Sequence, residues 1–459
     1  MKKFTLFLLS LFILFLSNSA FPKPVDVEQA EKAAYNFLYA RADNNIKSNL
    51  DVILYKVISD NVTKMNLYYI FNIKPQGFII ITADNNLTPV VAYSFEDNYV
   101  DNKNPVEEMW VKAQIKLATQ NIIEDKKNNS KWLSILNNIS TKGIETVPPL
   151  CTTKWNQDTY YNFMCPVDSN GPDNHAYAGC VATAMGQVMK YWNHPINGTS
   201  GYAYQHIWPM FFHNYGTVEA NFAATTYNWS NMPNTINNSN KIDVATLLFH
   251  CGVSVKTDYG PDGSGAQTES IPFALSHYFK YNEAVTYLER NFNPGRKWDS
   301  IIMGQLNKGF PMVYSGASLT DGHAWVVDGY QDSSYFHINW GWSGWNNGYF
   351  YFDNLNSGNG DFTNSQAAVI NIFPKDYVSI DDHELKQFSL YPNPAKNYFT
   401  INNVNNEFNV DIMNIKGMTI KSVANNKVIN TSGMDNGLYF VKITQGNMQR
   451  IIKLLILKN

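Results

Sequence analysis

The residue types that most often take part in catalysis are concentrated in one stretch of this chain, which indicates several domains of different composition. All four cysteines and eight of the nine histidines lie between residues 148 and 374, a stretch also rich in Gly, Trp and Tyr. The stretches before and after it differ in composition, and 459 residues exceed what one hydrophobic core serves. Because 44% of the residues are hydrophobic, the sequence predicts several folded domains and argues against a disordered chain.

Charge and cysteine count exclude several classes of function. A formal net charge of -3 with 16% charged residues leaves no basic surface for nucleic acid. Four cysteines are too few for a disulfide scaffold, although a bond between Cys151 and Cys165 stays open. Neither His-Glu-x-x-His nor Cys-x-x-Cys occurs, and Asp258 and Asp262 lack the spacing of known Ca²⁺ loops, so we expect no metal and no organic cofactor.

The first 20 residues are typical of a secretory signal peptide. Lys2 and Lys3 precede an apolar run over residues 4–16, and small residues follow up to Ala20. The run is shorter than the roughly 20 residues that span a bilayer, which argues against the alternative of a retained membrane anchor. Since no later apolar run reaches roughly 18 residues, we expect an exported mature form without a membrane span.

Residues 21–147 predict a separate α+β domain. Apolar positions recur at helical spacing over residues 25–41, and short β-rich runs bounded by Pro and Gly follow. The predicted strands are 67–73, 77–81 and 90–93, a charged helix is predicted over 106–117, and exposed linkers over 125–130 and 141–149. A change of composition predicts a domain boundary near residue 147.

Residues 375–459 predict a small antiparallel β-sandwich. They contain no Cys and no Trp, and turn signals such as Pro392-Asn393-Pro394 separate short alternating runs. The predicted strands include 399–401, 410–413 and 438–443. A sandwich fold by itself does not state a function, so binding of sugars or other partners stays open.

Cys180 is the first candidate for a reacting group. Gly179 precedes it and a helix-like run of small residues follows through residue 192, which predicts a helix N-terminus at Cys180. Unpaired backbone N–H groups and the helix dipole there would lower the thiol pKa below its usual value of about 8.5 and make the sulfur nucleophilic. The alternative is a buried cysteine packed among Ala and Gly.

Two predicted strands carry the partners that a nucleophilic cysteine needs. His323 follows Gly322 at the start of one strand and Asn339 ends the next, so the pair of strands could bring the imidazole beside an amide. His323 lies 143 residues after Cys180, and a Cys, His, Asn order with such a gap is typical of papain-like peptidases, although their local signature around the cysteine is absent. His337 is a rival base, but a packed strand histidine is its commoner role.

Gln157, in the run Trp155-Asn156-Gln157, is a candidate catalytic residue only in combination with Cys180 and His323. A tetrahedral intermediate of acyl transfer needs donors for its oxyanion. The side-chain amide of Gln157 and the backbone N–H of Cys180 would supply two such donors.

These motifs together resemble the streptopain family of secreted cysteine peptidases. The matching segments are 155–162, 179–191, 322–329 and 339–342, in the family's order. The resemblance implies that Cys180 is the nucleophile, that His323 is the general base and that Asn339 orients it. It also implies that Gln157 donates to the oxyanion and that Trp340 shields the pair from water. The residues that it implies contact the substrate are Gly322, Ser264 and Gly265.

The resemblance extends to both flanking domains. Residues 77–84 and 89–94 are similar to the family's inhibitory propeptide, which covers the cleft until it is cut away. Residues 390–395 and 436–443 resemble the carboxy-terminal sorting domain of proteins exported by the type IX secretion system of some Gram-negative bacteria. The implied partners are protein or peptide substrates, the chain's own propeptide and the secretion machinery.

The sequence therefore predicts an α+β papain-like peptidase domain at 148–374. A signal peptide at 1–20 and an α+β propeptide at 21–147 precede it, and an all-β sorting domain at 375–459 follows. We expect a secreted or cell-surface cysteine endopeptidase made as a zymogen, working through an imidazolium–thiolate pair and a thioester. The alternative is a secreted binding protein or adhesin without turnover, whose Trp-rich run at 340–345 grips peptide or glycan.

Overall fold

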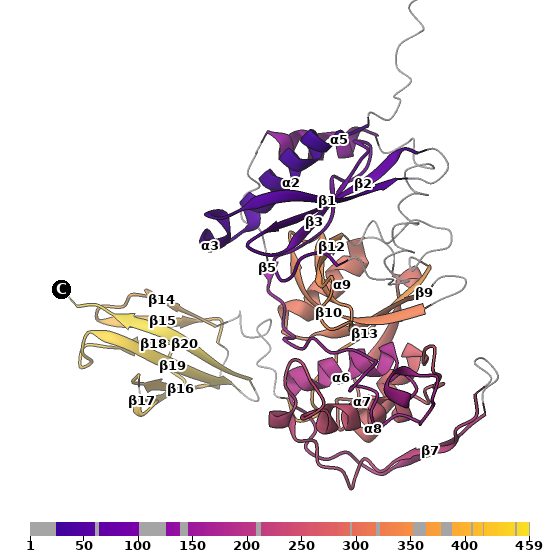
Figure 1. The fold of residues 1–459 in the computed structure, drawn as a ribbon. Coiled ribbons are helices and arrows are strands. Elements are labelled where there is room, and N and C mark those ends of the chain that lie inside the picture. The colour runs from indigo at the N-terminus through magenta and orange to yellow at the C-terminus, as the bar shows by residue number, and fades with distance from the viewer. Residues whose placement is uncertain are drawn as a thin grey trace, which may run out of the picture. The chain divides into compact units, whose positions relative to one another are not determined.

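The chain forms two compact units, Met1–Lys375 and Asp376–Asn459 (Figure 1). The computed structural model describes residues 24–59, 64–100, 125–137, 146–207, 213–293, 296–317, 322–351, 364–377, 388–404, 407–415, 417–445 and 448–458. The predicted signal peptide and the predicted helix at 106–117 lie outside these residues. No helix among the described residues is long and apolar enough to cross a bilayer.

The amino-terminal part of the first unit combines helices with antiparallel strands, and the helix predicted over 25–41 and the three predicted strands are confirmed. Its elements are α2 (Val27–Arg41), α3 (Asn44–Lys47), β1 (Asp51–Ser59), β2 (Asn66–Lys74), β3 (Phe78–Thr82), β4 (Val90–Ser94) and α5 (Asp125–Leu136). Asp26 caps α2 by accepting a hydrogen bond from the Gln29 N–H. The apolar face of α2, which includes Phe37 and Leu38, shares one core with strands β2 and β3.

The prediction of an exposed linker at residues 125–130 is wrong, because these residues begin helix α5. The polar run leads into Trp132, whose side chain is 2% exposed and whose Nε1–H donates to the Leu87 carbonyl over 3.0 Å. Tertiary packing of such a side chain stabilises a helix that local composition does not favour. The second predicted linker is in part a strand, since β5 (Thr146–Val147) pairs with β10.

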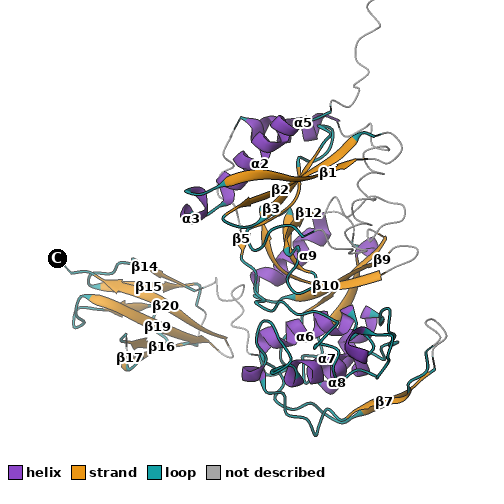
Figure 2. Ribbon diagram, viewed as in Figure 1, coloured by secondary structure: helices purple, strands orange, loops and turns teal. Residues whose placement is uncertain are grey.

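The second part of this unit carries helices on both faces of its strands (Figure 2). The longer elements are α6 (Cys180–Trp192), β6 (Tyr202–His206), β7 (Gly216–Ala220), α7 (Ile242–Ser254), α8 (Ile271–Tyr278), β8 (Thr286–Glu289), α9 (Arg296–Asn307), β9 (Met312–Ala317), β10 (Gly322–Gln331), β11 (Tyr335–Asn339), β12 (Gly348–Tyr351) and β13 (Asn364–Ile370). Short 3₁₀ turns lie at Pro172–Asn174, Trp229–Asn231, Thr268–Ser270 and Arg290–Phe292.

One antiparallel sheet runs through both parts of the first unit. Its strand order is β1-β2-β3-β4-β12-β11-β10-β9-β13-β8, and β5 pairs with β10 in addition. The two parts join where β4 pairs with β12, with Tyr93 opposite Tyr349. Gly348 permits this approach, because a Cβ there would lie 2.6 Å from the Tyr93 carbonyl oxygen. The amino-terminal part is therefore docked edge to edge on the second part.

Strand β10 separates two hydrophobic cores. Ala324 and Val326 pack into the core that contains α6 and α7, whereas Trp325 and Val327 pack into the core that contains α9. This alternation follows from the two-residue period of a β-strand. It assigns His323, at the start of the strand, to the same face as Trp325.

The carboxy-terminal unit is all β, as predicted. Its strands are β14 (Ser389–Tyr391), β15 (Tyr398–Asn402), β16 (Asn409–Met413), β17 (Thr419–Ala424), β18 (Val428–Asn430), β19 (Gly437–Gln445) and β20 (Met448–Ile456). They form two antiparallel sheets, in the orders β14-β15-β18 and β17-β16-β19-β20. Side chains from both sheets share one core, which includes Phe399, Val410 and Ile443.

Candidate active site

Cys180 begins helix α6, as the sequence predicts. Gly179 precedes it with φ at 90°, a conformation that favours glycine, and a Cβ at Gly179 would lie 3.1 Å from the Ser264 carbonyl oxygen. No side chain caps the helix, so backbone N–H groups of the first turn stay available beside the half-buried sulfur. The thiol is free, as are those of the three other cysteines.

The thiol pKa does not follow the prediction. Burial raises the pKa of Cys180, while the backbone N–H groups of Ala324, Val181 and Cys180 act in the opposite direction and do not overcome it. The predicted lowering is therefore wrong for this form of the chain, because the loss of solvation outweighs the helix N-terminus. The contact with Ala324 nevertheless places the sulfur against β10, the strand on which His323 lies.

His323 is buried in a cluster of tryptophan rings. Its ring centroid lies 4.6 Å from that of Trp342 in a stacked arrangement and 6.0 Å from that of Trp325. Its Nε2–H donates to the Trp340 carbonyl oxygen over 3.0 Å, which leaves Nδ1 as the basic nitrogen. Burial lowers the pKa of His323 to about 4, so the imidazole is neutral near pH 7.

Cys180 and His323 are not hydrogen-bonded to each other among the described residues. Strand alternation directs His323 to the Trp325 face of β10, whereas Ala324 faces helix α6. An ion pair of imidazolium and thiolate is therefore absent from this form of the chain. The roles of both residues stay predictions.

Asn339 does not contact His323 as predicted. Its side-chain amide donates to the Thr153 carbonyl over 2.6 Å, and its side-chain oxygen accepts the Gly341 N–H over 3.1 Å. The predicted hydrogen bond fails because the Trp340 carbonyl takes the imidazole N–H instead. Asn339 is 1% exposed and holds the chain segment that leads to Trp340.

Gln157 lies beside the start of helix α6. Its backbone carbonyl accepts the Ala178 N–H over 2.8 Å, two residues before Cys180. Its half-buried side chain makes no hydrogen bond to any residue that the structure describes. The side-chain amide is therefore available as a donor, which is what an oxyanion hole requires.

The predicted substrate-contacting residues lie on two segments near the nucleophile. The Ser264 hydroxyl donates to the Tyr177 carbonyl over 2.7 Å, which ties its loop to the residues before Cys180. Gly265 exchanges backbone hydrogen bonds with Asp258, and Gly322 begins β10 as an exposed residue. Ser264 thus has a visible structural role in addition to the predicted one.

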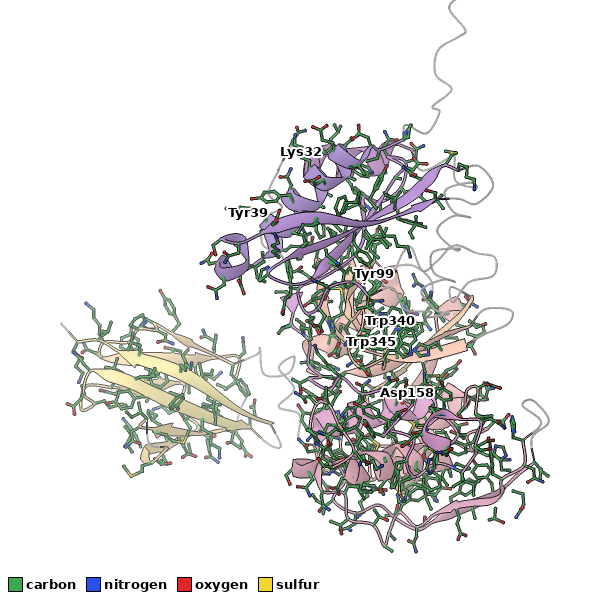
Figure 3. The ribbon with its side chains drawn as sticks, viewed as in Figure 1. Lys32, Tyr39, Tyr99, Asp158, Trp340 and Trp345 are labelled. Carbon is green, nitrogen blue, oxygen red and sulfur yellow. The ribbon has the colours of Figure 1, made fainter. Side chains whose placement is uncertain are left out.

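Trp340 lies in a loop that the amino-terminal part covers. Its indole N–H donates to the Asn346 carbonyl over 3.1 Å, and the Asn346 side chain exchanges two hydrogen bonds with the Val100 backbone. Tyr99 shares a buried core with Trp340, and Figure 3 labels both together with Trp345 of the same loop. Residues 99 and 100 therefore hold the segment against which His323 rests.

His337, the rival base, makes no hydrogen bond to Cys180 among the described residues. Its two ring nitrogens contact Asp328 and Glu96, which identifies it as a paired strand histidine. Sequence reasoning missed this ion pair and the stacking of Trp342 on His323. The Trp-rich run at 340–345 was the available signal for the stacking, whereas Glu96 lies 241 residues away from His337 and gave none.

The residues described here contain no group of three or more His, Cys, Asp or Glu that could hold a metal.

Three family models match this chain, one within each of the predicted domains that follow the signal peptide. The Spi protease inhibitor model matches residues 22–117, the Peptidase C10 family model matches residues 155–350, and the secretion system C-terminal sorting domain model matches residues 389–458.

Similar proteins match most of this chain. Streptopain of Streptococcus pyogenes is 30% identical over 372 residues, which are 76% of this chain and 91% of that protein. The thiol protease/hemagglutinin PrtT of Porphyromonas gingivalis is 30% identical over 376 residues, 76% of this chain and 42% of that protein. The structure of a mutant fragment of prointerpain A from Prevotella intermedia matches with a TM-score of 0.57 at 28% identity, covering 71% of this chain and 99% of that fragment.

Proposed function

Because this chain belongs to the peptidase C10 family, the family of streptopain, we propose that Cys180 is its nucleophile and His323 its general base. The chain is a secreted cysteine endopeptidase made as a zymogen, with an inhibitory propeptide ahead of the peptidase domain. A sorting domain for secretion follows, so the protein is exported to the exterior or to the cell surface.

The contact between the sulfur of Cys180 and strand β10 is the observation that best supports this assignment. The backbone N–H of Ala324 favours the charged form of the thiol, and His323 is the residue directly before it. The nucleophile and the base therefore lie on neighbouring segments, although the two side chains do not pair in this form. We propose that activation frees His323 from the Trp340 carbonyl and turns its Nδ1 toward Cys180.

The proposed reaction begins with transfer of the Cys180 thiol proton to His323. The thiolate attacks the scissile carbonyl carbon, and the side chain of Gln157 with the Cys180 N–H donates to the oxyanion. His323 then gives its proton to the leaving amine, and a thioester forms on Cys180. Water, deprotonated by His323, hydrolyses the thioester and restores the thiol.

The other predicted site residues act around this pair. We propose that Asn339 positions the chain at Trp340 and orients His323 once the imidazole has moved, and that Trp340 keeps water from the pair. Gly322, Ser264 and Gly265 would contact the substrate backbone, which their position beside the nucleophile supports. No step requires a metal or an organic cofactor.

Maturation and export complete the proposal. We propose that a signal peptide at 1–20 directs the first export step, that cleavage near residue 147 separates the propeptide from the peptidase domain at 148–374, and that the domain at 375–459 engages an outer-membrane secretion system. Mass spectrometry of the secreted species tests these limits through the new termini.

A casein zymogram tests the assignment of the nucleophile. The matured protein and its Cys165→Ala control should clear casein, whereas Cys180→Ala should not. Cys165 serves as the control because it is another free cysteine of the same domain and has no predicted role in the reaction. Equal clearing by the Cys180→Ala protein would refute the assignment, and no clearing in any lane after propeptide removal would favour a binding protein without turnover.

A further inference from the structure

The loop after strand β4 carries two acidic residues onto the peptidase domain. Glu96 Oε1 lies 2.7 Å from Nε2 of His337 on β11, and Asp97 Oδ2 lies 2.6 Å from Nζ of Lys154. Strand β4 is itself hydrogen-bonded to β12, so the shared sheet fixes the start of this loop. Neither contact involves the residues assigned to catalysis.

His337 is held from both ends of its ring. Nδ1 lies 2.6 Å from Oδ1 of Asp328, and the other oxygen of Asp328 accepts the Cys151 N–H over 2.7 Å. His337 is 2% exposed and Asp328 is fully buried. Because each ring nitrogen faces a carboxylate oxygen, an imidazolium at His337 can donate to both partners.

The charged and titratable groups that face His337 come from each element packed against it. Asp328 lies on β10, Glu96 follows β4, and Tyr349 on β12 places its ring centroid 5.2 Å from the imidazole. Burial alone would lower the pKa of His337, but the two carboxylates outweigh burial and raise it to about 10. Burial would likewise raise the pKa of Glu96, but His337 and Lys154 hold it below its usual value.

The peptidase side of this arrangement is incomplete without the propeptide. Asp328 satisfies one ring nitrogen of His337, and only Glu96 satisfies the other among the residues that the structure describes. A buried cationic N–H without an acceptor is strongly unfavourable. The peptidase domain is therefore built to receive a carboxylate at this point, with Lys154 beside it for a second.

We propose that His337, Asp328 and Lys154 form a carboxylate-binding surface of the peptidase domain, and that Glu96 and Asp97 of the propeptide are its ligand. This surface, which we call the propeptide anchor, holds the zymogen together at a place distinct from Cys180 and His323. The proposal rests on the zymogen assignment above and adds a specific contact through which the propeptide is retained.

The anchor has a defined pH dependence. Glu96 contributes to docking above its ordinary pKa of about 4.3, and this contribution is lost as pH falls through the lowered value. His337 contributes fully below its ordinary pKa of about 6.5, and this contribution is lost as pH rises toward 10. The propeptide should therefore be held best in mildly acidic solution.

The first test follows activation of the full chain near pH 6. We compare the wild type, Glu96→Gln and Glu31→Gln, whose carboxylate is exposed on α2 and lies on the same propeptide. The Glu96→Gln zymogen should gain peptide-hydrolysing activity about tenfold faster than the wild type, while Glu31→Gln should match the wild type. A Glu96→Gln zymogen that activates at the wild-type rate would overturn the proposal.

A second test does not depend on activity. In the full chain with Cys180→Ala, thermal unfolding is followed from about pH 4 to about pH 9 with and without Glu96→Gln. The Glu96→Gln chain should unfold at a lower temperature near pH 6 and should vary less with pH, and Glu31→Gln should do neither. Identical pH profiles would overturn the anchor. If no zymogen ever gains activity, the assignment of Cys180 and His323 fails, while this profile still decides the anchor.

Discussion

His323 and His337 lie on adjacent strands of one sheet, and both are nearly inaccessible to solvent, yet their protonation is opposite. Burial lowers the pKa of His323 to about 4, whereas the pKa of His337 is raised to about 10. The neighbours make the difference. His323 meets tryptophan rings and one backbone carbonyl, and His337 meets two carboxylates.

The contrast separates two uses of a buried imidazole. A neutral ring whose Nδ1 has no hydrogen-bond partner among the described residues can accept a proton, which suits a base that waits for activation. An imidazolium fixed between two carboxylates cannot change its charge near pH 7, which suits a permanent contact. Local strand sequence does not distinguish the two cases, because both residues follow the same alternating pattern.

Loss of activity should separate the two histidines most strongly. His323→Ala should lower kcat/KM of the matured enzyme by about 10³-fold or more, because the general base is gone. His337→Gln should retain most of the activity per folded molecule. Hydrolysis of a fluorogenic peptide, normalised to folded protein, measures both. An equal loss in the two variants would end the distinction.

Removal of the Asp328 carboxylate should destabilise the folded chain, because the charged His337 loses a partner. Asp328→Asn leaves the buried His337 without its inner partner, and breaking such a pair costs about 3 kcal/mol in the free energy of unfolding. Urea unfolding of the full chain with Cys180→Ala measures this change. Asp173→Asn, which alters an exposed carboxylate of the same domain, should have little effect. A small effect of Asp328→Asn would mean that solvent already reaches His337.

The neutral His323 should make the folded chain less stable in acid, and we call this fall in the free energy of unfolding the acid limb. Because the pKa of His323 is lowered to about 4, its contribution to stability is present above about pH 6.5 and is lost as pH falls toward 4, on the order of 3 kcal/mol. His323→Gln, which does not titrate, should flatten this limb in the Cys180→Ala chain. Unfolding free energies measured across this range test it, and an unchanged limb would show that His323 is solvated.

The exposed half of the anchor should matter least. The side chain of Asp97 is 50% exposed and that of Lys154 is 34% exposed. Asp97→Asn should therefore change the free energy of unfolding by less than about 1 kcal/mol, and moderate salt should reduce the change further. A larger effect than that of Glu96→Gln would reverse the ranking of the two carboxylates and move the centre of the anchor to Lys154.

Local patterns in the sequence were sufficient for the elements that carry the nucleophile. Gly179 and the small residues after it predicted the helix start at Cys180, and alternation predicted the strands of His323 and Asn339. The same patterns could not give the state of the residues. His323 contacts the Trp340 carbonyl through tertiary packing, and Trp340 lies in a loop that is hydrogen-bonded to Val100 through Asn346, which no local pattern encodes.

Long-range pairing was the other missing element. The junction of β4 with β12 joins segments more than 250 residues apart, and the contact of Glu96 with His337 depends on it. The thiol pKa was mispredicted for a related reason, since the helix N-terminus was visible in the sequence but the burial of Cys180 was not. Residues 125–130 were misread because Trp132, which anchors the helix, comes after them.

The junction of β4 and β12 also determines which strand of the mature enzyme becomes an edge. Once the propeptide departs, the short strand Gly348–Tyr351 loses its neighbour and presents unpaired backbone donors and acceptors. Such an edge strand can pair with an extended polypeptide, such as a cleaved product or a second copy of the protease. Propeptide removal thus converts an interior strand of the zymogen into an edge strand of the enzyme.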